Sequence, residues 1–270
     1  MIYAAFTFWL FLIAFMGMGI YRLWSGLVPS IWINWALLPG TAVSELAYIF
    51  GCLITGGEIK RAKLIETGGQ KGDSGGPAAS QGSATEATPR LKFIGPAVAS
   101  LLSIVACAAA ILLLHKYLGR GVIDQFNATL MAKPCHVLST ALPTSWETFW
   151  DMLVEQVRLL QRSCQAWADL HWSDWHVPVF VYLSVCLGIR LAPARREVRA
   201  MLASLVLVSA GIAVAGLASE EFNTLMGDIW PLLTYVWASL LLLLAATLLI
   251  RAAAALVMIL AGKKTKTAKS

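Results

Sequence analysis

The sequence predicts an all-α protein, a polytopic membrane helix bundle of about six transmembrane helices with one external amphipathic helix. Hydrophobic residues make up 58% of the 270-residue chain and charged residues only 13%, against roughly 25% charged residues in soluble domains. Apolar runs long enough to cross a bilayer alternate with shorter polar connections. Lys and Arg flank these runs, so the net charge of +6 indicates membrane topology and a lipid bilayer as partner, with no sign of nucleic-acid binding.

The chain divides into segments of different composition. They are 1–66 with the first two transmembrane helices, 67–92 as a disordered cytoplasmic linker, 93–118 with the third transmembrane helix, 119–176 as an external segment, 177–262 with the last three transmembrane helices, and 263–270 as a basic tail.

The first two apolar runs are expected to cross the membrane one after the other. Residues 2–21 carry no charge, and about 20 residues at about 1.5 Å each match about 30 Å of hydrocarbon. The second span, about 31–55, contains Pro39-Gly40 near its start. The later spans are expected at about 93–114, 177–192, 200–217 and 229–260.

The linker 67–92 is rich in Gly, Ser, Ala and Thr and has little to bury, which is typical of disordered segments. Residues 72–77, GDSGGP, are identical to the sequence around the nucleophilic Ser of chymotrypsin-like proteases. That chemistry needs a His base and a buried Asp on a β-barrel scaffold. A helical membrane protein has no such barrel, so the match is interpreted as chance.

An amphipathic helix is predicted in the external segment, with Thr144 as its N-cap and Glu147 completing a capping box. Its apolar side chains recur at spacings of three and four. They are Trp146, Phe149, Trp150, Leu153, Val157, Leu160, Cys164 and Trp167. This helix is expected either to lie in the membrane interface as a lid over the membrane site or to pack against the bundle.

The distribution of Lys and Arg predicts an orientation with both termini inside. Six of these residues fall in 57–92, four in 190–199 and four in 263–270. These segments are then cytoplasmic by the positive-inside rule. The segment 119–176 is then external, and the protein is expected in a bacterial inner membrane.

Glu45 is the leading candidate for a functional residue because it lies within the second apolar run, with no Lys or Arg within a helical turn of it in sequence. A carboxylate near the bilayer centre costs at least about 2.5 kcal/mol on insertion scales. An intramembrane Glu therefore indicates a functional site. Thr41 and Ser44, on adjacent turns, are expected to offer it a hydroxyl partner.

The stretch that contains Glu45, PGTAVSELAY from Pro39 to Tyr48, resembles the PGxxxHExxH helix of membrane-embedded zinc metallopeptidases of the site-2-protease type. In that motif two His bind zinc from one helix face and the Glu acts as general base on the metal-bound water. Here Ser44 and Tyr48 stand at the His positions, and Glu45 keeps the position of the base. The resemblance also implies that Glu197 corresponds to an acidic residue of that family.

We therefore expect a degenerate, non-catalytic relative of these peptidases, with no cofactor, that uses the substrate groove to hold a transmembrane protein or peptide. Glu45 is the remnant of the catalytic site, and Thr41, Ser44, Tyr48 and Glu197 are the candidate binding residues. Two alternatives stay open. Glu45 is a proton or cation site in a small transporter or channel component, or the protein is an active metallopeptidase that holds zinc through atypical ligands.

Overall fold

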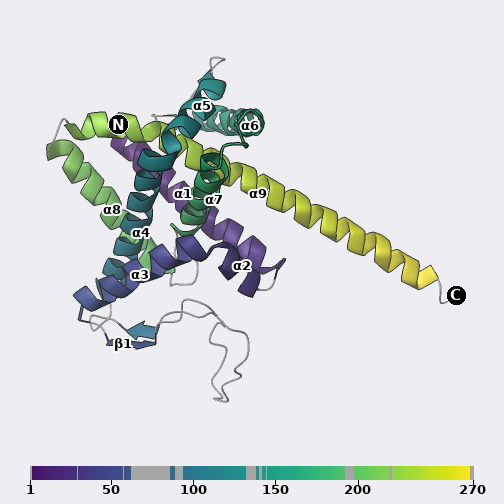
Figure 1. Ribbon diagram of the computed structural model, residues 1–270, viewed down its shortest axis with the longest axis horizontal. Helices are drawn as coiled ribbons and strands as arrows, with labels where there is room; N and C mark the ends of the chain where they lie inside the picture. Colours follow the sequence, from purple (N-terminus) through teal and green to yellow (C-terminus); the bar gives the residue numbers. More distant parts are fainter. Residues whose placement is uncertain are drawn as a thin grey trace.

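Helices account for nearly all of the chain that the computed structural model of the protein describes (Figure 1). The described residues are 2–28, 30–56, 58–61, 86–88, 94–131, 138–139, 142–143, 145–191, 198–218 and 221–267. The helices are α1 (Ile2–Ser25), α2 (Ser30–Ala36), α3 (Leu38–Ile54), α4 (Ile94–Leu114), the π-helical turn η1 (His115–Gly119), α5 (Arg120–Met131), α6 (Trp146–Ala168), α7 (His176–Arg190), α8 (Val198–Ala218) and α9 (Glu221–Thr267).

Three helices in the described part of the chain are long and apolar enough to cross a membrane. They are Ile2–Ser25, Gly95–Leu130 and Leu225–Ile259. Three further apolar helices, Leu38–Ile54, His176–Arg190 and Leu202–Gly216, are shorter. The class of an apolar helical membrane protein is thus confirmed, whereas the count of about six spans stays a prediction.

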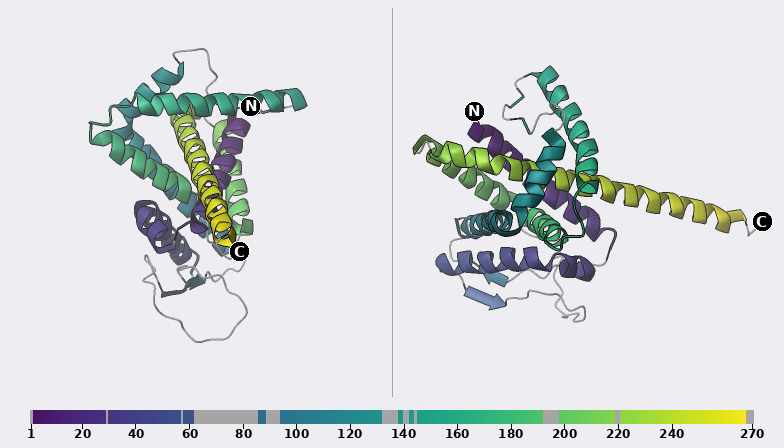
Figure 2. Two further views of the ribbon diagram at one scale, coloured as in Figure 1. Left: turned by 90° about the vertical axis from the view of Figure 1, so that its right-hand side faces the viewer. Right: turned by 45° about the horizontal axis from the view of Figure 1, so that its top comes forward.

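The second predicted span is two helices instead of one. The chain breaks between α2 and α3 at Leu37, two residues before Pro39, whose ring removes a backbone donor and limits the preceding residues. The Ala36 carbonyl at the break accepts hydrogen bonds from the Tyr182 hydroxyl (2.7 Å) and the Cys186 thiol (3.4 Å) of α7. Figures 1 and 2 show α2 and α3 together at the end of the molecule opposite α5 and α6.

Two hydrogen bonds between distant parts of the chain place the start of α1 in the bundle. The Tyr3 hydroxyl at the start of α1 donates to the Gly216 carbonyl (3.3 Å), and the Trp9 indole N–H donates to the Ser139 carbonyl (3.0 Å). The start of α1 therefore lies at the same end of the bundle as the segment 119–176. This common end does not fit an inside N-terminus together with an external 119–176, and the orientation of the chain in the membrane stays a prediction.

Two short strands, β1 (Glu58–Arg61) and β2 (Glu86–Thr88), pair antiparallel just beyond α3. β2 falls within the predicted linker, and the all-α prediction did not include this pair. The remainder of the linker, with residues 72–77, lies outside the described residues, as do Glu197 and most of the segment between α5 and α6.

The amphipathic helix is confirmed as α6, with its start one residue later than predicted. Ser145 is the N-cap, and its hydroxyl and that of Thr148 complete the capping box. α6 buries Leu159 and Ala166 against its neighbours α5 and α9. Trp146 and most of the other side chains in the predicted apolar stripe stay exposed.

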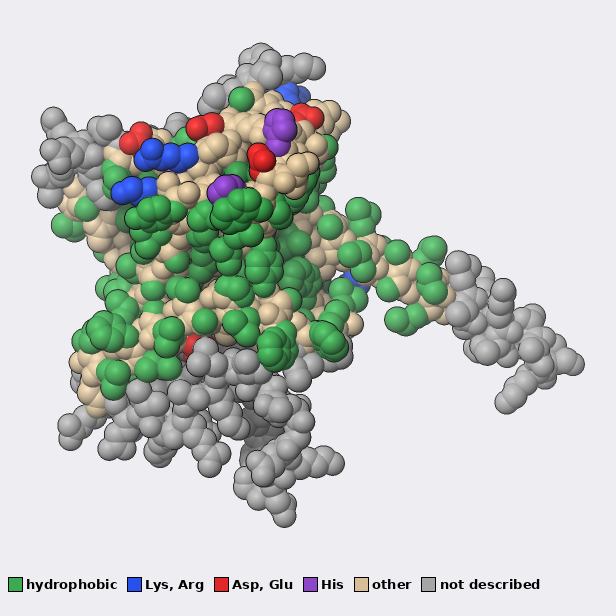
Figure 3. Space-filling model, viewed as in Figure 1, with side chains coloured by type: hydrophobic (Ala, Val, Ile, Leu, Met, Phe, Trp, Pro, Cys, Tyr) green, Lys and Arg blue, Asp and Glu red, His purple; other side chains and the backbone are tan. Residues whose placement is uncertain are grey.

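α6 lies at the opposite end of the bundle from α3 in both views of Figure 2, so it is not a lid over the predicted site. On the face that Figure 3 shows, most of the coloured charged side chains lie in a band at the same upper end, and hydrophobic side chains cover the surface below. The exposed aromatic side chains of α6 thus sit near a boundary between polar and apolar surface. This position is typical of Trp at a membrane interface.

Aromatic side chains on α9 form the centre of the core. Tyr235 is fully buried and lies 5.1 Å from Phe126 and 5.4 Å from Phe180, measured between ring centroids. Trp237 contacts Trp9 of α1 edge to face at 5.2 Å. Residues 232–240 are buried in succession, which places this part of α9 in contact with helices on all sides.

The helix from α4 to α5 is continuous but contains the π-helical turn η1. Gly119 ends this turn against Phe180 of α7, and a Cβ atom at Gly119 would overlap the Phe180 ring. Short π-helical turns inside α-helices are frequent at functional sites. In this protein η1 borders the groove described below.

Candidate functional site

The helix that carries the predicted site begins and ends for local reasons. Pro39 occupies the first turn of α3, where its missing N–H has no helical partner to lose. The Thr41 hydroxyl donates to the Leu37 carbonyl (2.7 Å). Gly56 follows the last turn with a positive φ of 69°, a conformation that glycine adopts without strain.

Ser44 and Tyr48 lie on one face of α3, as their spacing predicts, and this face is packed directly against α4. The Ser44 and Ser103 hydroxyls are 2.9 Å apart, and the Ser103 hydroxyl also lies 3.2 Å from the Ser44 carbonyl. Tyr48 is buried in a small cluster with Cys52 and Ala99. The two positions that hold His in the metallopeptidase motif therefore face a closed contact between two helices.

Gly51 explains why α3 and α4 approach so closely. A Cβ atom at Gly51 would lie 2.7 Å from the Ala99 Cα, so only glycine fits at this contact. Small residues allow such close packing of membrane helices. Ser44 meets Ser103 while Gly51 meets Ala99, so the two helices run antiparallel.

Glu45 is half-buried on the neighbouring face of α3, beside the exposed Leu46. The hydroxyls of Thr41 and Ser44 bond to Leu37 and Ser103, so neither hydroxyl is the predicted partner of Glu45. Glu197 lies outside the described residues. The described part of the chain contains no group of three His, Cys, Asp or Glu side chains that could hold a metal ion.

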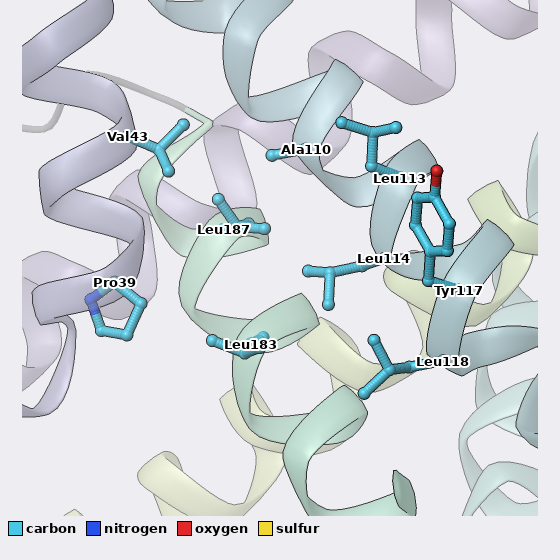
Figure 4. Close-up of a pocket in the computed structure, with 9 residues that line it drawn as sticks. All are labelled: Pro39, Val43, Ala110, Leu113, Leu114, Tyr117, Leu118, Leu183 and Leu187. Atoms are coloured by element: carbon cyan, nitrogen blue, oxygen red, sulfur yellow. The ribbon is translucent and has the colours of Figure 1, made fainter.

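An apolar groove adjoins the first turns of α3, with a cavity of about 340 Å³ (Figure 4). Pro39 and Val43 of α3 line one side, and Leu183 and Leu187 of α7 lie between them and the α4 side (Figure 4). The other lining residues come from α4 and η1 and are Ala110, Leu113, Leu114, Tyr117 and Leu118. The lining contains no charged side chain, so the groove is suited to binding apolar groups.

Tyr117 gives this groove its one polar side-chain group. Its side chain is 73% exposed and extends from η1, with the hydroxyl directed away from Leu118 in Figure 4. An aromatic side chain with a polar tip suits a contact that is apolar on one side and hydrogen-bonding on the other.

Arg190, at the end of α7, is buried, whereas its position after an apolar run predicts an exposed charge. It is only 6% exposed, its Nη2 donates to the Asn34 Oδ1 of α2 at 3.3 Å, and its guanidinium lies 4.8 Å from the centroid of the Tyr21 ring. The cation therefore joins α7 to α1 and α2 through a hydrogen bond and a cation–π contact.

Gly40 of α3 belongs to the same contact region. A Cβ atom there would overlap the Cys186 carbonyl and would lie 3.2 Å from the Cγ of Arg190. Both residues of the PG pair therefore have a structural role in this chain. Pro39 lies in the first turn of α3, and Gly40 leaves room for the backbone of α7. The signal for Arg190 was present in the sequence, because Asn34 and Arg190 are polar residues within or at the end of apolar runs.

In comparisons with known protein families, with curated proteins and with solved structures, nothing matches this chain. The resemblance of α3 to the metallopeptidase helix therefore rests on the residues of α3 themselves.

Proposed function

We propose that this protein is a non-catalytic membrane protein that holds a transmembrane helix of a partner protein in the groove between α3, η1 and α7. The observation that carries the proposal is the packing of Ser44 and Tyr48 onto α4. The helix face on which a metallopeptidase would bind zinc is occupied by a neighbouring helix, while the adjacent face, with Pro39 and Val43, is open to the groove.

The chemistry of the groove supports binding of a helix. Its walls are leucines and other apolar side chains carried by helices on two sides, which present ridges that the side chains of a third helix can enter. A cavity of about 340 Å³ accommodates several apolar side chains. The Tyr117 hydroxyl supplies a hydrogen bond at the edge of the contact.

We place the protein in a bacterial inner membrane with the α3 end of the bundle on the cytoplasmic side. Arg22 is exposed at the end of α1, and Lys60 and Arg61 belong to β1, which follows α3. A cytoplasmic location for these basic residues satisfies the positive-inside rule. The start of α1 and the whole of α6 are then on the opposite side.

Photochemical crosslinking from Tyr117 tests the groove. Benzoylphenylalanine at Tyr117, in native membranes, is expected to form an adduct with a membrane protein, and the added substitution Leu183→Trp is expected to remove that adduct by filling the groove. Val206 is the matched control, since it is 64% exposed on α8 and does not line the groove. Adducts with lipid only, at both positions, would contradict the proposal.

Metal analysis tests the absence of catalysis separately. The purified protein is expected to carry no stoichiometric zinc and to show no chelator-sensitive cleavage of membrane peptides. Zinc in a one-to-one ratio, together with cleavage that Glu45→Gln abolishes, would establish an active peptidase instead. Proton flux that Glu45→Gln abolishes, in protein free of zinc, would establish a transporter.

A further inference from the structure

The C-terminal half of α9 projects far beyond the bundle (Figure 1). Residues 232–240 of this helix are buried in succession, whereas residues 248–259, here called the arm, are exposed on almost every face. Leu249 and Met258 are 71% and 73% exposed. The apolar part of the helix, Leu225–Ile259, has 35 residues, and its length of about 52 Å exceeds the roughly 30 Å of a hydrocarbon layer.

The arm leaves the bundle at a defined point. The Trp24 indole N–H of α1 donates to the Thr247 hydroxyl at 2.9 Å, and Thr247 is buried. One helical turn later, Arg251 is exposed. Within the described part of the chain, Arg251 has no ion pair and no hydrogen bond from its guanidinium.

Arg251 is far from any other charge along its helix. The apolar run continues from Ala252 to Gly262 before the first Lys of the tail, Lys263. That Lys is 12 residues away, or about 18 Å along the helix axis. A lone Arg within hydrocarbon is costly, and such residues pair with a group of opposite charge.

The surface next to Arg251 is shaped for a close helix contact. Ala254 and Ala255, three and four residues further on, share the helix face of Arg251, and small residues let the backbones of membrane helices approach each other. At that separation, a carboxylate on the neighbouring helix reaches the guanidinium and pairs with it through two parallel hydrogen bonds. A second copy of the arm does not fit this role, because it would bring a second Arg251 to the contact.

We propose that the arm binds a single transmembrane helix of another protein, through an ion pair between Arg251 and an Asp or Glu near the middle of that helix. The alanines provide the close contact and Arg251 provides the selectivity. This binding is independent of the groove, which lies between α3, η1 and α7 and includes no residue of α9.

Synthetic transmembrane peptides test this proposal directly. The full-length protein, with a fluorophore at its C-terminus, is placed in phosphatidylcholine vesicles with a labelled Leu/Ala peptide that carries Asp, Leu or Lys at its centre. Energy transfer is expected to show about tenfold tighter binding of the Asp peptide than of the Leu peptide. Arg251→Leu should remove this preference, and Arg251→Asp should transfer it to the Lys peptide.

Two controls make the outcome decisive. Arg158→Leu, at an exposed position of α6, should leave the tenfold preference for the Asp peptide intact. Equal binding of the Asp and Leu peptides, or a preference that survives Arg251→Leu, would overturn the proposal. So would loss of the preference when phosphatidylglycerol is added, because Arg251 would then pair with lipid headgroups.

Discussion

Arg190 lies at the end of the apolar helix α7 and Arg251 lies within the apolar helix α9, but their surroundings differ completely. Arg190 is 6% exposed, bonded to Asn34 and stacked over Tyr21, so it belongs to the internal structure of the bundle. Arg251 is exposed on a helix that has left the bundle. The same residue type thus fixes the packing of three helices in one place and is available to a partner in the other.

Removal of the Asn34 amide tests whether Arg190 depends on its internal partner. Asn34→Leu should lower the free energy of unfolding by about 2 to 3 kcal/mol, because a buried guanidinium loses an acceptor. The double variant Asn34→Leu/Arg190→Met should recover part of this loss, since both partners are then apolar. Arg251→Met, the control, should change the free energy of unfolding by less than about 0.5 kcal/mol.

These values would be measured by denaturant unfolding in detergent micelles. An Asn34→Leu variant as stable as the Arg251→Met variant would show that the two arginines do not differ in the way described.

Substitution of Gly40 tests the close contact between α3 and α7, which includes the Arg190 side chain. Gly40→Ala should cost about 1 to 3 kcal/mol, because the new methyl group overlaps the Cys186 carbonyl. The matched change Gly211→Ala, where nothing lies within 4 Å of the added Cβ, should instead stabilise α8 by up to about 1 kcal/mol. Thermal unfolding of the two variants side by side gives the comparison, and a stable Gly40→Ala protein would argue against the tight contact.

The Tyr21 ring tests the cation–π contact with Arg190. Tyr21→Leu should cost about 1 to 2 kcal/mol more than Tyr21→Phe, because Phe keeps a ring beneath the guanidinium. The measurement is the difference between the two unfolding free energies. A difference near zero would show that the Tyr21 ring does not stabilise the buried Arg190.

The hydrogen bond between Trp24 and Thr247 marks the boundary between the buried part of α9 and the arm. Trp24→Phe and Thr247→Val should each cost about 0.5 to 1 kcal/mol. In a double-mutant cycle the combined variant should lose less than the sum of the two single losses, because both remove the same bond. Full additivity would mean that this bond does not anchor the arm.

Hydropathy and spacing could predict the membrane class, the amphipathic helix and the common face of Ser44 and Tyr48. These properties depend on residues close together in sequence. The break between α2 and α3 at Leu37 could not be predicted in the same way, because hydropathy measures the length of an apolar run and not where its helix is interrupted. Pro39 was visible in the sequence, but it is compatible both with the start of a crossing helix and with a turn.

The candidate site shows the same limit. The spacing of Ser44 and Tyr48 defines a face but cannot say that Ser103 and Ala99 cover it, since those residues are about 50 to 60 positions away. The burial of Arg190 could not be predicted for a related reason. Its position at the end of an apolar run is the same for a solvent-exposed Arg and for one enclosed by Asn34 and Tyr21.

The π-helical turn between α4 and α5 has a consequence for how the chain tolerates change. A π turn holds one residue more than an α turn, so every side chain after Gly119 is rotated by about 100° from where an unbroken α-helix would place it. Because of this offset, one continuous helix packs against α3 with its first part, α4, and against α6 with its last part, α5. Loss of a single residue between His115 and Gly119 would therefore convert the π turn into an α turn and leave Phe126 in the aromatic core, whereas the same loss between Arg120 and Gln125 would turn Phe126 out of it.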